Sequence, residues 1–177
     1  MKQRTDGWRH DGHERPSFAV PPRDGQESVW DYPRPPRIEL DRRDVVVRAG
    51  DVVLARTERA LRVLETASPP TFYLPPEDVR MDLLARARGT SWCEWKGAAT
   101  YWDVVLPERR LARVGWSYEG PTPAFTSLSG HLGFYPAHLE CFVGGVRVAP
   151  QPGRFYGGWV TPEITGPIKG EPGTESW

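Results

Sequence analysis

The chain has 177 residues, enough for one domain with a proper core, and its mean hydropathy of −0.55 is typical of a soluble protein. Basic and acidic residues balance at 23 each, with no basic stripe, which argues against a protein that holds nucleic acid by its charge. No apolar run approaches the ~20 residues that span a bilayer, and the first residues lack the apolar segment of a secretory signal. With only two cysteines in the chain, a disulfide framework is improbable. We therefore expect a cytoplasmic protein without a nucleic-acid or membrane partner.

Residues 1–28 are charged, contain glycine and proline and have no periodicity, which predicts a disordered tail. The ordered body is expected to begin near Val29 and to run to residue 177 as one β-rich domain. Of the 23 basic residues only three are lysines, a bias typical of a GC-rich bacterial genome. The two internal lysines, Lys96 and Lys169, therefore stand out.

Short apolar or alternating runs separated by turn residues predict a mainly β fold. In chain order the expected strands are R-I-E-L (37–40), D-V-V-V-R (44–48), D-V-V-L-A-R (51–56), T-F-Y-L (71–74), S-W-C-E-W (91–95), A-T-Y-W-D-V-V-L (99–106), R-L-A-R-V-G-W-S-Y (110–118), H-L-G-F-Y (131–135), L-E-C-F-V (139–143) and V-R-V-A-P (146–150). The A-G-D between the second and third runs, and Gly144-Gly145, are turn signals.

Two or three short helices are expected beside these strands. T-E-R-A-L-R-V-L-E-T (57–66) places Leu61 and Leu64 at a helical spacing, with Thr57 as a cap. P-P-E-D-V-R-M-D-L-L-A (75–85) has proline where a helix begins. The 19 prolines and 18 glycines argue against longer helices.

The densest chemical motif is W-C-E-W-K-G, residues 92–97. Cys93 is the candidate nucleophile of a cysteine-dependent transferase or hydrolase, which needs a neighbour that stabilises the thiolate. Strand alternation places Lys96 on the other side from Cys93, so that it flanks a pocket without pointing with the thiol. The alternative is that Cys93 is a small buried residue between two tryptophans. Cys141, within an apolar run, is expected in the core.

Acid–base chemistry is a further possibility, because alternation puts Tyr101 and Asp103 on one face of a strand. With Lys96 and Cys93 they form the candidate catalytic set. The candidate ligand-binding residues are mostly aromatic, since several tryptophans together often line a pocket: Trp92, Trp95, Tyr118, Tyr73, Trp159, Lys169 and His131. The alternative for each is an aromatic core with polar tips at the sheet edge.

Metal chemistry has little support in the sequence. His10 and His13 lie in the tail, and His131 and His138 are separated by a turn, so we expect no bound metal and no cofactor. Nucleotidyl transfer needs metal-bound carboxylates and a phosphate-binding loop, for which Glu77-Asp78, Asp103 and the generic G-G-W at 157–159 are weak candidates.

Several blocks resemble the family of domain of unknown function 427: Y-P-R-P-P-R, R-A-L-R-V-L-E-T, F-Y-L-P-P-E-D-V, W-C-E-W-K-G, G-H-L-G-F-Y-P and F-Y-G-G-W-V-T-P-E-I-T-G-P-I-K-G-E-P-G-T. The resemblance covers about residues 28–177. It implies a nucleotidyltransferase-like label without an established mechanism, and a mainly β fold similar to the tent-like fold of Mss4 and the B-type methionine sulfoxide reductases. Relatives in that wider group often bind zinc through C-x-x-C pairs, which this chain lacks, so the resemblance implies the fold without zinc.

Together these observations predict a β-domain that binds a small molecule in an aromatic cleft, with enzymatic turnover left open. The alternatives are cysteine-dependent chemistry, nucleotidyltransferase-like activity and a non-catalytic protein-interaction module. Whether the chain acts alone or as a homodimer stays open.

Overall fold

The structure of the protein is a computed structural model that describes residues 8–177. It is mainly β, as expected. The strands are β1 (Glu27–Ser28), β2 (Arg37–Asp41), β3 (Val45–Ala49), β4 (Val52–Thr57), β5 (Ala60–Leu64), β6 (Thr71–Tyr73), β7 (Leu84–Cys93), β8 (Gly97–Leu106), β9 (Arg109–Ser117), β10 (Leu132–Phe134), β11 (Glu140–Val143), β12 (Val146–Arg147), β13 (Ala149–Pro150), β14 (Trp159–Val160) and β15 (Ile164–Thr165). Short 3-10 helices are η1 (Val29–Asp31), η2 (Pro76–Asp78), η3 (Met81–Leu83) and η4 (Pro123–Leu128).

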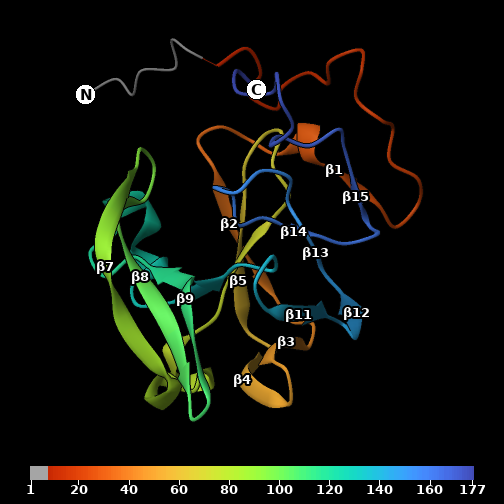
Figure 1. The fold of residues 1–177 in the computed structure, drawn as a ribbon. Helices are drawn as coiled ribbons and strands as arrows, with labels where there is room; N and C mark the ends of the chain where they lie inside the picture. Colours follow the sequence, from red (N-terminus) through yellow and green to blue (C-terminus); the bar gives the residue numbers. More distant parts are fainter. Residues whose placement is uncertain (1–7) are drawn as a thin grey trace.

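Three small antiparallel sheets form the body, with strand orders β10-β9-β8-β7, β12-β11-β3-β4 and β2-β5-β6. In Figure 1 the long β7, β8 and β9 stand on one side of the molecule, with β2 and β5 beside them. A bridge between Leu74 and Leu132 connects the end of β6 to β10 and so joins the first and third sheets. Two further two-stranded sheets, β1-β15 and β13-β14, are separate from these three, and β1-β15 pairs an N-terminal with a C-terminal segment.

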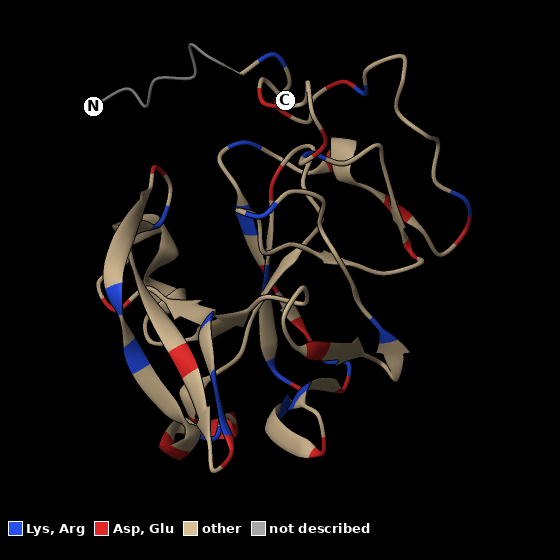
Figure 2. Ribbon diagram, viewed as in Figure 1, with Lys and Arg blue, Asp and Glu red and all other residues tan. Residues whose placement is uncertain are grey.

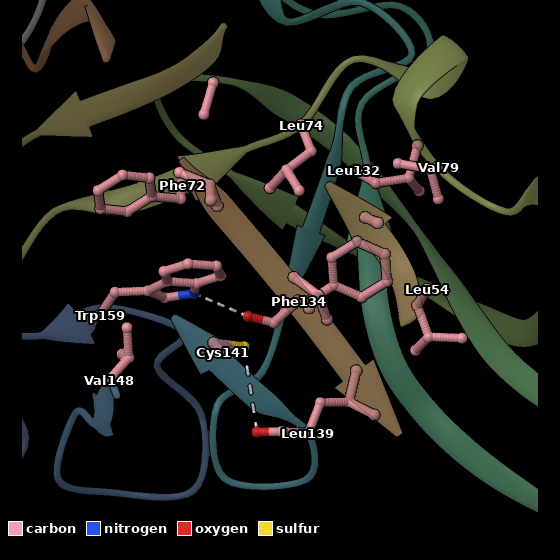
Figure 3. Packing of buried hydrophobic residues seen from close by; sticks show 14 of the residues in the cluster. Leu54, Phe72, Leu74, Val79, Leu132, Phe134, Leu139, Cys141, Val148 and Trp159 are labelled. Atoms are coloured by element: carbon pink, nitrogen blue, oxygen red, sulfur yellow. Dashed lines mark hydrogen bonds between the residues drawn. The ribbon is translucent and has the colours of Figure 1, made fainter. Parts of the chain in front are cut away.

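The main hydrophobic core fills the space between these sheets (Figure 3). Phe72 and Trp159 stack there with ring centroids 4.8 Å apart, and Trp159 Nε1 donates a hydrogen bond to the main-chain oxygen of Phe134. Cys141 is only 1% exposed and lies in the same core, which confirms its predicted position. Burial of these large apolar surfaces is the main favourable term in folding.

The helix predicted at residues 57–66 is wrong. Residues Ala60–Leu64 form β5, which pairs with β2 on one side and β6 on the other. A central strand satisfies its backbone through two neighbours, and this tertiary pairing overrides the local helical spacing of Leu61 and Leu64. Thr57 caps no helix; its hydroxyl donates to Asp78. Residues 75–85 give only η2, η3 and the start of β7.

The first seven residues of the predicted tail lie outside the described residues. The remainder, residues 8–28, passes close to the C-terminal segment (Figure 1). Phe18 stacks on Trp177 with centroids 5.2 Å apart, and Val20 N donates to the main-chain oxygen of Gly166. These contacts put the tail segment against the C-terminal residues, while the boundary at residue 28 stays a prediction.

Charged residues of both signs are interspersed along the elements rather than gathered on one of them (Figure 2). Many pair locally, as in Arg56 with Asp44 and Arg80 with Asp82. Over residues 8–177, no helix has the length and apolar character that crossing a lipid bilayer requires.

Candidate functional site

A pocket of about 440 Å³ opens beside the strands that carry W-C-E-W-K-G. Most of its wall comes from four places: β5, β6 and the loop between them, the end of β7 with the following turn, the inward residues of β8 and β9, and the C-terminal segment 151–157. Trp8, Tyr135 and Lys169 complete it. Ten of the 23 described residues that line it are aromatic, against 11% aromatic residues in the whole chain. This volume and this lining are typical of a small-molecule site.

Strand alternation separates the pocket from the main core. On β6, Phe72 and the following Leu74 belong to the main core, whereas Tyr73 belongs to the aromatic cluster around the pocket. Tyr101 of β8 and Trp116 of β9 lie in that same cluster. Because successive side chains of a strand point to opposite faces, one set of strands builds both the core and the pocket wall.

Trp116 is the central wall of the pocket. Its indole ring lies 4.5 Å from the ring of Tyr135 and 6.0 Å from that of Tyr73, between centroids. Two glycines make room for it: a Cβ on Gly133 would lie 2.6 Å from the indole, and one on Gly157 would lie 2.3 Å from it. Real Cβ atoms do not approach so closely, so the backbone reaches the ring only because these residues are glycines.

The turn between β7 and β8 carries the lysine of the motif into the pocket. Residues 94–96 form this turn, and Gly97 follows with a φ of +95°. Thr122 fixes the turn from outside: its hydroxyl donates to the main-chain oxygen of Trp95, and its N–H donates to that of Lys96. The predicted strand therefore ends at Cys93, two residues early. The expectation that Lys96 lies on the side opposite Cys93 is wrong, because a turn does not alternate and both residues line the pocket.

Lys96 is only 9% exposed, and its ammonium lies 5.8 Å from the centroid of the Tyr118 ring. Burial disfavours the charged form, but Tyr73, Cys93 and Glu65 outweigh it, so the pKa of Lys96 lies above its ordinary value. Within residues 8–177, no carboxylate forms an ion pair with Lys96. The pocket thus contains a protonated lysine without an acidic protein partner.

Cys93 is half-buried and lines the pocket, so the alternative of a fully buried thiol does not describe it. Nearby, the hydroxyls of Ser91 and Tyr101 share a hydrogen bond of 2.7 Å. Burial raises the pKa of the Tyr73 and Tyr118 phenols above the ordinary value. At neutral pH both are therefore uncharged hydroxyls.

A second group of charges borders the pocket at the C-terminal segment. Lys169 Nζ donates to the main-chain oxygen of Trp177 and lies 4.7 Å from the centroid of the Trp8 ring. Burial and the neighbouring Arg34 lower the pKa of Lys169. Arg34 in turn binds Glu65, with a distance of 3.3 Å between Nε and Oε1. Unlike Lys96, these groups have partners within the protein.

Of the predicted site residues, eight line this pocket and three do not. Those in the pocket are Tyr73, Trp92, Cys93, Trp95, Lys96, Tyr101, Tyr118 and Lys169. Asp103 instead accepts hydrogen bonds from the backbone N–H of Arg113 and from the Arg110 side chain, contacts that hold its pKa below the ordinary value. Trp159 is fully buried in the main core. His131 contacts the main-chain oxygen of Ser129.

The sequence analysis missed several lining residues. These are chiefly Trp116 and Tyr135 on the inner wall, Trp8, Phe155 and Tyr156 near the segments at the two chain ends, and the polar Glu65, Glu94 and Gln151. A signal existed for Trp116, which shares the face of Tyr118 two residues later. Glu94 lies within the W-C-E-W-K-G motif itself. Nothing local marks the others, because segments distant in sequence bring them to the pocket.

Among the residues that the structure describes, no cluster of three or more His, Cys, Asp and Glu side chains is arranged to hold a metal ion. The described lining offers the amines of Lys96 and Lys169, the Cys93 thiol, two carboxylates, several phenol hydroxyls and a large aromatic surface.

The comparison with protein families identifies one family. The profile described as "Domain of unknown function (DUF427)" matches residues 37–145, more than half of the chain. The chain belongs to this family. The match includes β2 to β11 and the W-C-E-W-K-G turn, whereas the C-terminal wall of the pocket lies beyond it. No curated protein matches the chain.

Proposed function

We propose that this DUF427 protein binds a small organic molecule with a planar, unsaturated part in the aromatic pocket. The observation that carries this proposal is the pocket wall itself, where Trp116 stands between Gly133 and Gly157 and faces Tyr73 and Tyr135. Aromatic rings offer flat apolar surfaces for stacking, and the hydroxyls beside them orient a ligand.

The rim of the pocket supports the same function. Trp92 and Phe155 line it and are 73% and 71% exposed, so two large apolar rings face solvent at its edge. Exposed rings of this size often contact a ligand. Trp92 comes from β7 and Phe155 from the C-terminal segment, so a bound molecule would contact both sides of the opening.

The test uses ligand-observed NMR to measure whether compounds from a library of one- and two-ring aromatic molecules bind to the protein. Ser68 lines the pocket, so Ser68→Trp should fill part of it and abolish the binding. Ser127→Trp, at an exposed serine of η4 outside the pocket, is the matched control and should bind like the wild type. Absence of binding by wild type, or equal binding by both variants, would contradict the proposal.

Enzymatic turnover is a second candidate, favoured by the position of Cys93 in the same pocket as Lys96. A thiol beside a protonated amine is an arrangement that supports nucleophilic chemistry. Mass spectrometry of a metabolite extract before and after incubation separates turnover from binding, with Cys93→Ser as the variant that removes the nucleophile. Turnover that persists in Cys93→Ser would exclude the thiol mechanism.

A further inference from the structure

Lys96 is a largely buried cation whose charge is not paired with a carboxylate of the described residues. Its side chain is more than nine-tenths buried, yet no acidic side chain of residues 8–177 pairs with it. A buried charge without a partner costs several kcal/mol, and proteins usually avoid it. Two neighbouring cations differ: Lys169, which also lines the pocket, binds the main-chain oxygen of Trp177, and Arg34 behind it binds Glu65.

The surroundings of Lys96 keep the amine charged. Burial disfavours the ammonium, but the negative charge of Glu65 and a hydrogen bond with Cys93 favour it, so the pKa of Lys96 lies above its ordinary value. Neither carboxylate that lines the pocket forms an ion pair with Lys96: Glu65 pairs with Arg34, and Glu94 is exposed. A fixed positive charge in a pocket of about 440 Å³ attracts an anionic group.

We infer that the ligand of this pocket carries a single carboxylate, which pairs with Lys96 while the planar part of the molecule packs on the aromatic wall around Trp116. This inference rests on the proposed function and adds the charge class of the ligand. A phosphate fits less well. A phosphate dianion is usually held by several backbone N–H groups, or by a bidentate arginine, whereas Arg34 here is occupied by Glu65 and by three main-chain oxygens.

The experiment compares acids with their neutral amides by isothermal titration calorimetry on the full chain. The probes are benzoate with benzamide, indole-3-carboxylate with indole-3-carboxamide, and phenyl phosphate. For wild type we expect each acid to bind at least about tenfold more tightly than its amide, the size of one charge-assisted hydrogen bond. Phenyl phosphate should bind more weakly than benzoate.

The decisive variant is Lys96→Met, which keeps an unbranched side chain only one atom shorter and removes its charge. It should lose the preference for acids while the amides bind within about twofold of wild type, because only the charge pairing is removed. Arg147→Met removes one positive charge from the exposed β12 and should leave every affinity unchanged. Thermal unfolding without ligand supplies a second readout: Lys96→Met should be at least as stable as wild type, since an unpaired buried charge disappears.

Each outcome separates the two proposals. If acids and amides bind wild type equally, or if phenyl phosphate binds best, the carboxylate inference fails and the aromatic pocket stands. If Lys96→Met unfolds or melts well below wild type, the lysine is structural and the inference fails as well. If none of the five probes and no library compound binds, the proposed function itself is wrong.

Discussion

At the scale of single residues, the two cysteines occupy opposite environments. Cys141 lies in the main core, where burial raises the pKa of its thiol, and Cys93 lines the pocket at half burial. The sequence alone suggested that Cys93 could also be buried, because Trp92 and Trp95 lie close to it in the chain. Trp92 points outward and is 73% exposed, however, so it leaves the thiol accessible from the pocket.

This contrast predicts different alkylation rates. Iodoacetamide should label Cys93 of the native protein well before Cys141, because alkylation needs both access and the thiolate. Peptide mass spectrometry over a time course measures both sites in one sample, and a urea-unfolded sample, in which both should react, is the control. Equal and slow labelling of the two residues would rule out cysteine-dependent chemistry and leave binding alone.

At the scale of elements, the C-terminal segment contributes to the pocket wall with side chains such as Phe155 and Tyr156 and with its backbone at Gly157. Gly157 passes so near Trp116 that a Cβ there would lie 2.3 Å from the indole Cη2. The segment can follow this path only without a side chain at that position. The first glycine of F-Y-G-G-W thus has a specific role, because it lets the backbone pack on the Trp116 ring.

Gly157→Ala should therefore displace Trp116 or lift the segment from it. We expect a loss of about 1–3 kcal/mol in the free energy of unfolding, the usual cost of overpacking, with weaker binding of the aromatic probes. Urea denaturation measures the first quantity and calorimetry the second. Gly120→Ala is the matched control, because a Cβ there meets no atom within 4 Å. Equal effects of the two substitutions would show that the contact with Trp116 is unimportant.

At the scale of the whole molecule, the tryptophans divide into core and pocket residues. Trp159 is fully buried, stacks on Phe72 and donates its N–H to the main-chain oxygen of Phe134. Trp92 is mostly exposed at the pocket edge. Stability and ligand binding should accordingly depend on different tryptophans.

Trp159→Phe should lower the free energy of unfolding by about 2–4 kcal/mol, because it leaves a buried carbonyl without its donor and opens a void. Trp92→Phe, at an exposed position, should change stability by no more than about 0.5 kcal/mol. Urea denaturation of the two variants provides the comparison. A Trp159→Phe variant as stable as wild type would mean that the Phe134 hydrogen bond and the packing around it contribute little.

The sequence by itself determined the β-rich class and most strand positions, because alternation and turn residues are local signals, as at D-V-V-V-R and Gly144-Gly145. It also pointed to Trp92–Lys96 and Tyr101 as pocket residues.

The tertiary structure decided those features that local sequence patterns cannot determine. β5 became a strand because β2 and β6 pair with both of its edges. Lys96 lines the pocket together with Cys93 because residues 94–96 form a turn, which a hydrogen bond from Thr122 stabilises. Tyr135, Phe155 and Tyr156 reach the pocket through contacts between segments distant in sequence, for which no short stretch carries a signal.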